Sequence, residues 1–167
     1  MQSVNMGLSG VFTLECLDDS GNLKWSENFD NIVVNAGLDH TLDSTIGAAT
    51  QVTSWYVGVT DGTPTTAATD TMASHAGWVE IVAYSEAVRQ NLTVVASSGQ
   101  SVTNSASKAS YTINGTATVG GAFIVSDSAK SGTAGTLFSV GAFTGGDRAV
   151  VASDVLNVTY TLSASDV

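Results

Sequence analysis

The 167 residues suffice for one domain with a buried core and leave no room for a second domain of ordinary size. Fifteen acidic side chains stand against five basic ones, for a formal net charge of −10 at pH 7, and such a field repels the phosphate backbone of a nucleic acid. Cys16 is the only cysteine, which excludes an intrachain disulfide and a cysteine-based metal site.

We expect the chain to consist of two parts, a flexible N-terminal arm over residues 1–10 and a single β domain over residues 11–167. Val11 to Leu17 alternates between apolar and polar side chains, which predicts a strand with Cys16 as a small core residue. Turn formers at Asp18 to Asn22 and a second extended run from Leu23 to Glu27 complete a predicted hairpin.

The next segment predicts one short helix. Asn35 is the expected N-cap, and Gly47 is the expected end. Leu38, Leu42 and Ile46 recur every four residues and therefore share one face of such a helix. We expect this apolar face to lie over the edge or mouth of the sheet.

Two aromatic strands are predicted in the middle of the chain. The first is Trp55 to Thr60. The second lies within Thr69 to Glu86, where Trp78 to Ser85 alternates and predicts a central strand buried on much of both faces. Before it, Asp70 is the expected cap of one helical turn that Gly77 ends in a left-handed conformation.

The last third of the chain contains short extended runs separated by Gly, Asn, Asp or Ser. Val88 to Ala96 predicts a less regular strand, and Ser97 to Ser107 an exposed loop. The further predicted strands are Ala109 to Ile113, Thr116 to Val125, Thr136 to Phe143, Arg148 to Ala152 and Val155 to Leu162. Their spacing predicts an all-β fold, a single-domain β-sandwich or jelly-roll-like barrel.

The residues needed for catalysis are scarce. His40 and His75 are the only histidines, and no serine lies in a G-x-S-x-G sequence, so we expect no catalytic residues and no enzyme activity. His40 is expected to be solvated. His75 is expected to be a hydrogen-bonded packing residue beside Trp78.

Two acidic groups are candidate metal sites. Asp18, Asp19 and Asn22 resemble the start of a calcium loop, but the glutamate of the full motif is absent and a hairpin turn explains them. Asp39, His40 and Asp43 lie on the predicted helix without a strong metal-ligand spacing. No phosphate-binding loop occurs, and the pairs Gly120-Gly121 and Gly145-Gly146 predict bends or bulges. We therefore expect no metal and no cofactor.

Targeting signals are also missing. No apolar run approaches the ~20 residues that span a bilayer, and the N-terminus lacks the basic and apolar regions of a signal peptide. The expectation is a soluble protein, made in the cytoplasm, that does not bind membranes.

Several segments together resemble small proteins of tailed bacteriophages and prophages. The segments are Asn35-Ala36-Gly37-Leu38-Asp39, Trp55-Tyr56-Val57-Gly58, Asp70 to Trp78, Ala106-Ser107-Lys108-Ala109, Gly121-Ala122-Phe123 and Leu137-Phe138-Ser139. The resemblance covers most of the chain, and among such proteins it is to the capsid decoration, or cement, proteins encoded with the head genes.

This resemblance implies a structural virion protein that binds the outer surface of the major capsid protein and stabilises the phage head. The expected location is the outer capsid surface, after synthesis in the cytoplasm of the host bacterium. Self-association is expected, as a trimer on local threefold axes or, as the alternative, a dimer. The alternative function is a tail or fibre component that binds a host receptor or glycan.

Two kinds of residue are candidates for the interface. Trp55, Trp78 and Tyr84 are either core residues or interface anchors. The arm from Met1 to Gly10 is polar and would be able to add a strand to the sheet of a neighbour.

Overall fold

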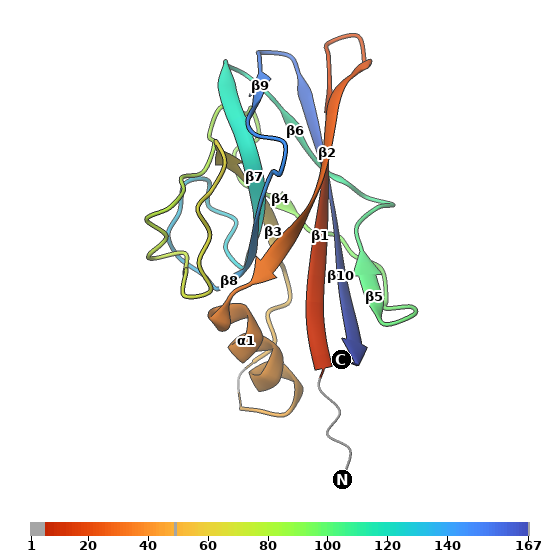
Figure 1. Cartoon of the computed structure of the whole chain (residues 1–167), viewed down its shortest axis with the longest axis vertical. Helices are drawn as coiled ribbons and strands as arrows, with labels where there is room; N and C mark the ends of the chain where they lie inside the picture. The colour runs from red at the N-terminus through yellow and green to blue at the C-terminus, as the bar shows by residue number, and fades with distance from the viewer. Residues whose placement is uncertain (1–5, 49, 167) are drawn as a thin grey trace.

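The computed structural model describes residues 6–48 and 50–166, which form ten β-strands and one helix (Figure 1). The elements are β1 (Met6–Leu17), β2 (Leu23–Val33), α1 (Asn35–Thr45), β3 (Tyr56–Asp61), β4 (Gln90–Asn91), β5 (Ser101–Thr103), β6 (Ala109–Thr112), β7 (Ala117–Val125), β8 (Leu137–Ala142), β9 (Arg148–Val150) and β10 (Val155–Asp166). The strands lie in the order β4-β3-β7-β8-β2-β1-β10-β5, with β6 also beside β10 and β9 also beside β7. The all-β prediction is confirmed.

The strand β2 belongs to both halves of this antiparallel sheet. Its first part pairs with β1 as far as Val11↔Asp30. From Asn31 to Val33 it leaves β1 and pairs with β8 instead. Because one strand changes partner in this way, the sheet curls, and the half that contains β1 and β10 faces the half that contains β3, β7 and β8 (Figure 1).

The larger hydrophobic core fills the space between the two halves. Phe12 and Leu14 from β1 meet Val57 and Val59 from β3 and Ile124 from β7 there, all of them buried. A second cluster covers the outer face of β7 and β8, with Val34, Met72, Trp78, Phe123 and Leu137 among its members. β7 is therefore buried on both faces, which explains why its apolar residues run on without alternating.

The predicted hairpin is confirmed and is longer than expected, since β1 and β2 run past the predicted limits. The Asp18 carboxylate accepts hydrogen bonds from the backbone N–H groups of Ser20 and Asn22, at 2.9 and 2.8 Å. The bonds from Asn22 favour the charged form and lower the pKa of Asp18. Gly21 adopts φ +82°, which the turn requires. These acidic residues form a turn, as predicted.

The expected N-terminal arm is shorter in the structure. Met6 to Gly10 are the first part of β1 and pair with β10, from Met6↔Asp166 to Gly10↔Leu162. The prediction of a flexible arm is therefore wrong for these residues, because a long partner strand satisfies their backbone groups. The rest of the predicted arm, residues 1–5, lies outside the described residues.

The predicted central strand, Trp78 to Ser85, is not a strand. It makes only isolated bridges, Thr60↔Glu80 and Tyr84↔Ile113. Its buried residues are Trp78, Ile81 and Tyr84, so burial recurs every third residue and not every second one. The alternation of polar and apolar residues suggested a regular strand, whereas tertiary contacts turn the chain differently.

Residues 78–89, called the crossing segment below, connect the two halves of the sheet. The N–H of Ile81 donates to the carbonyl of Val59 in β3 at 2.9 Å. The N–H of Ser85 donates to the carbonyl of Thr112 in β6 at 2.8 Å. Because β3 and β6 belong to opposite halves, the crossing segment closes the side of the sandwich that lies opposite the bend in β2.

The turn before the crossing segment also differs from its prediction. Thr71 and Ser74 exchange backbone hydrogen bonds in a tight turn, not a helical one. Asp70 accepts hydrogen bonds from the N–H of Ala67 and the indole of Trp78, so it is not a helix cap. Gly77 is not among the left-handed glycines of the described chain. It is needed because a Cβ there would lie 2.1 Å from the carbonyl oxygen of Thr65.

The strand predictions in the last third are confirmed for β6 to β10, with small differences at the ends. In contrast, only Gln90–Asn91 of the predicted strand Val88 to Ala96 forms a strand, apart from an isolated bridge at Val88↔Ala129, and the predicted loop Ser97 to Ser107 contains β5. The register between β3 and β7 jumps from Thr60↔Gly121 to Asp61↔Val119, which leaves Gly120 as a bulge. The prediction of a bulge or bend at the first glycine pair is confirmed.

Candidate functional site

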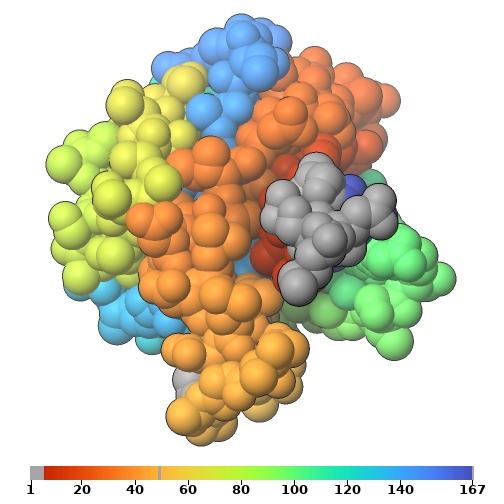
Figure 2. Space-filling view, turned by 60° about the horizontal axis from the view of Figure 1, so that its bottom comes forward, coloured from red at the N-terminus to blue at the C-terminus, as the bar shows by residue number. Residues whose placement is uncertain are grey.

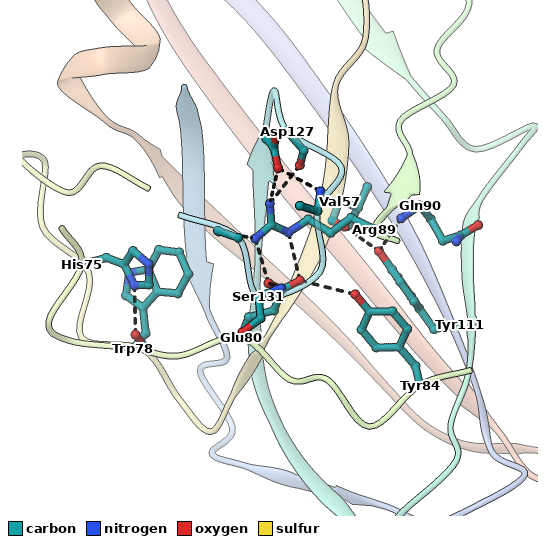
Figure 3. A network of polar contacts seen from close by, with 12 residues as sticks. Val57, His75, Trp78, Glu80, Tyr84, Arg89, Gln90, Tyr111, Asp127 and Ser131 are labelled. Carbon is teal, nitrogen blue, oxygen red and sulfur yellow. Dashed lines mark hydrogen bonds and ion pairs between the residues drawn. The ribbon is translucent and has the colours of Figure 1, made fainter. Parts of the chain in front are cut away.

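The tightest group of charged side chains surrounds Arg89, whose side chain is fully buried (Figure 3). Its Nε and Nη2 donate to the two carboxylate oxygens of Glu80, at 3.0 and 2.8 Å. Its Nη2 also donates to the carbonyl of Gly132, and its Nη1 donates to the carbonyl of Asp127. The guanidinium lies 5.3 Å from the centre of the Phe123 ring. Arg89 therefore ties the crossing segment to the loop between β7 and β8.

The partners of Arg89 are themselves hydrogen-bonded. Glu80 accepts further bonds from the N–H of Ser131 and from the hydroxyl of Tyr84. Tyr111 accepts from the N–H of Gln90 and donates to the carbonyl of Val57. Burial raises the pKa values of Tyr84 and Tyr111, so both hydroxyls stay protonated. The members of this network are hydrogen-bonded to one another inside the protein, so the network stabilises the fold at this point.

The two histidines occupy separate environments. His75 stacks on Trp78 with ring centres 3.8 Å apart, and its Nδ1 lies 3.0 Å from the carbonyl oxygen of Trp78 (Figure 3). This is the packing role predicted for it. His40 is half-buried against Trp55, with ring centres 5.3 Å apart, so the prediction that it is solvated is wrong. Among the described residues, neither ring is hydrogen-bonded to a serine or a carboxylate.

Cys16 is fully buried in the main core, as predicted. Burial and the nearby Asp154 raise the pKa of its thiol from 9.0 to about 11. The folded protein then holds this proton more tightly than the unfolded chain does, so a rise in pH through that interval favours unfolding.

We expect the free energy of unfolding to be insensitive to this thiol below pH 9 and to fall by about 1.4 kcal/mol per pH unit between pH 9 and 11. Urea unfolding at several alkaline pH values measures the slope. Cys16→Ala is the control, and its slope between pH 9 and 10 should be flatter whatever its absolute stability. An equal slope in both proteins would assign the alkaline sensitivity to other groups.

The helix α1 faces the opposite way from its prediction. Leu38, Leu42 and Ile46 are 40%, 61% and 88% exposed, so the apolar face points to solvent and does not cover the sheet. Gly37 is buried against β8, where a Cβ would lie 2.3 Å from the carbonyl oxygen of Phe138. The N-cap is Val34, without a side-chain cap bond, and Asn35 is the first helical residue. The close contact at Gly37 decides which face meets the sheet.

This exposed face, called the α1 face below and consisting of Leu38, Leu42 and Ile46, lies at one end of the molecule. Figure 2 looks onto that end, with α1 and the segment after it in orange and amber. The start of β1 and the end of β10, which pair at Met6↔Asp166, lie at this same end of the molecule (Figure 1). In the described chain β2 pairs with β1 only from Val11 onward, so the neighbouring edge of Met6 to Gly10 carries no second strand. An apolar helix face and an open strand edge are both features through which proteins associate.

Two of the three aromatic residues considered as interface anchors are core residues. Trp78 and Tyr84 are 5% and 2% exposed, so neither is available to a partner. Trp55 is half-buried and lines a cavity beside Phe138. Sequence reasoning missed the role of Arg89, because its partner Glu80 lies nine positions away and no local spacing links the two.

The described residues hold no group of three or more His, Cys, Asp or Glu side chains placed to bind a metal ion. In the same residues, no helix has the length and apolar character needed to cross a membrane. Comparison with protein-family models finds no match, and comparisons with curated proteins and with solved structures find none either.

Proposed function

We propose that this chain is a structural virion protein of a tailed bacteriophage, which binds the outer surface of the major capsid protein and stabilises the head. The observation that carries the proposal is the α1 face, three large apolar side chains that the fold turns toward solvent. The motif resemblance described above supports the phage setting. The saturated network around Arg89 and the absence of a metal cluster among the described residues fit a role that depends on contacts.

The proposed contact has a simple physical basis. Full burial of a Leu or Ile side chain contributes about 1.5–3 kcal/mol, and Leu42 and Ile46 have most of that gain still available. The open edge of β1 over Met6 to Gly10 adds backbone hydrogen bonds if a capsid strand pairs with it. Such a contact is weak for one copy, but a homo-oligomer engages several sites at once and binds more tightly through multivalency. A trimer on local threefold axes is the arrangement we propose.

The number of copies per particle tests the location. We expect this protein to be close to equimolar with the major capsid protein when purified virions are separated on a gel and the bands are quantified. A few copies per particle would contradict shell decoration and would instead favour a tail or fibre component that binds a receptor or glycan.

Charge substitutions on the α1 face test the contact. Leu42→Lys and Ile46→Lys are each expected to weaken binding to empty capsids about tenfold or more, because a buried apolar contact is replaced by a charge that must be desolvated. Co-sedimentation of the purified protein with capsids measures the loss. Thermal unfolding should change little, since both side chains are exposed.

Leu23→Lys is the matched control for this experiment. Leu23 is 59% exposed and begins β2 beside the hairpin turn, at the other end of the molecule (Figure 1). The chemical change is identical, so an effect of charge alone would appear in all three variants. Equal loss of binding in Leu23→Lys, or unchanged binding in the two helix variants, would contradict a contact through α1.

A further inference from the structure

The two halves of the sheet separate at the α1 end and leave a cavity of about 330 Å³ between them. Its walls come from both halves and from the segments before β3 and after β4. The lining includes Trp55, Leu92, Ile124, Phe138, Tyr160 and Leu162. This space belongs to the interior of the sandwich and is separate from the α1 face.

Three of the side chains that line the cavity, Trp55, Phe138 and Tyr160, are aromatic, and neighbouring groups hold them in place. Trp55 meets Phe138 edge to face, with ring centres 5.4 Å apart, and meets His40 in the same way on its other side. The hydroxyl of Tyr160 accepts hydrogen bonds from Asn31 and Ser139, at 2.9 and 3.3 Å. These contacts fix the rings, so the cavity is formed before any ligand enters.

The chemistry of the lining limits what it can bind. None of the side chains that line the cavity carries a charge, and the hydroxyl of Tyr160 is already engaged by its two neighbours. Besides Tyr160, the polar side chains of the lining are the uncharged Gln51 and Thr53, so a charged ligand would lose hydration without gaining a counter-charge. The three aromatic side chains favour flat apolar rings, which they contact edge to face or stacked, and most of the remaining lining is aliphatic.

The volume limits the size of the ligand. An apolar cavity of about 150 Å³ holds a benzene molecule, and ligand pockets in proteins begin at about 300 Å³. The present cavity therefore has room for more than one ring. We propose that it binds a small, uncharged ligand built of two or three aromatic rings, and this proposal does not depend on the capsid function.

The probe for the test is N-phenyl-1-naphthylamine, an uncharged naphthalene derivative whose fluorescence rises in apolar surroundings. Titration into the full chain should give saturable binding of one molecule per protein, with a dissociation constant on the order of 1–10 μM. Naphthalene, which is not fluorescent at the same wavelengths, should displace the probe. Absent or non-saturable binding, or no displacement, would overturn the proposal.

Two neighbouring valines provide matched variants. Val94 lines the cavity and is 43% exposed, whereas Val95 is 59% exposed and is not part of the lining. Val94→Trp fills the opening and should weaken binding of the probe about tenfold or more, whereas Val95→Trp should stay within about twofold of the parent. Similar affinities in the two variants would overturn the assignment to this cavity.

Two further measurements distinguish binding of the probe in the cavity from binding to exposed apolar surface. 1-Anilinonaphthalene-8-sulfonate has the same ring framework with a negative charge, and it should bind at least about tenfold more weakly because the lining offers no cation. Leu42→Lys on the α1 face should retain full binding of the uncharged probe. Equal binding of the two dyes, or loss of binding in Leu42→Lys, would show that the probe reports the surface and would overturn the proposal.

Discussion

An Arg89→Met variant is expected to lose about 3–5 kcal/mol of its free energy of unfolding, because it leaves a buried carboxylate without its counter-charge. The Glu80 side chain is 5% exposed and would keep only its bonds to Ser131 and Tyr84. The carbonyls of Asp127 and Gly132 would lose their donors as well. Urea unfolding followed by tryptophan fluorescence measures the change.

Lys108→Met is the control for this variant. Lys108 pairs with Glu15 across the surface, and the two side chains are 39% and 32% exposed. Solvent screens this pair, so its removal should change the free energy of unfolding by less than about 1 kcal/mol. A comparable loss in the two variants would show that the burial of Arg89 has no special importance.

The double variant Arg89→Met, Glu80→Met separates the charge from the packing. Removing both charges eliminates the unpaired carboxylate, so the double variant should be less destabilised than Arg89→Met alone. If the loss of stability in the double variant instead equals the sum of the losses in Arg89→Met and Glu80→Met measured singly, the ion pair contributes little. The hydrogen bonds from Arg89 to the loop between β7 and β8 then dominate.

Gly120→Ala is expected to cost about 3 kcal/mol or more, because the new methyl group would meet backbone atoms that cannot move aside independently. A Cβ at Gly120 would lie 1.9 Å from the nitrogen of Thr63 and 2.0 Å from the carbonyl carbon of Gly62. The bulge in β7 brings the turn after β3 this close. Thermal and urea unfolding measure the loss.

Gly115→Ala is the matched control for the glycine variant. A Cβ at Gly115 would have Ala83 as its nearest neighbour, at 3.8 Å, an ordinary contact, and its φ is not in the left-handed region. Removing the extra freedom of glycine from the unfolded chain should leave stability unchanged or raise it by about 0.4–1 kcal/mol. A large loss at Gly115, or none at Gly120, would contradict the close approach of the turn to β7.

Local patterns in the sequence predicted the fold class and most strands, but they did not predict the tertiary contacts. The hairpin was predictable because its turn chemistry and its alternation both lie within a few residues of Asp18. The crossing segment was not, because it is hydrogen-bonded first to β3 and then to β6, which only the folded chain brings near it. In the same way, the Leu38, Leu42 and Ile46 pattern predicted a helix correctly but not which face it buries.

The candidate site was still less predictable from the sequence. An exposed apolar face and a buried one have the same spacing, and only the contact of Gly37 with Phe138 distinguishes them. Arg89 lies in the predicted strand Val88 to Ala96, and nothing in that pattern indicates that it is among the largest fully buried side chains. The cavity between the two halves of the sheet depends on how far the halves separate, which no local pattern encodes.

The pairing of β1 with β10 has a consequence for how the protein forms. This register joins opposite ends of the described chain, from Met6↔Asp166 to Leu17↔Val155, and it provides the partner on one side of the first strand. A ribosome makes β1 well before β10, so the β1 edge of the hairpin of β1 and β2 stays open until β10 is made. Folds dominated by such distant contacts form slowly. We expect the nascent chain to depend on protection of this edge against aggregation until β10 has left the ribosome.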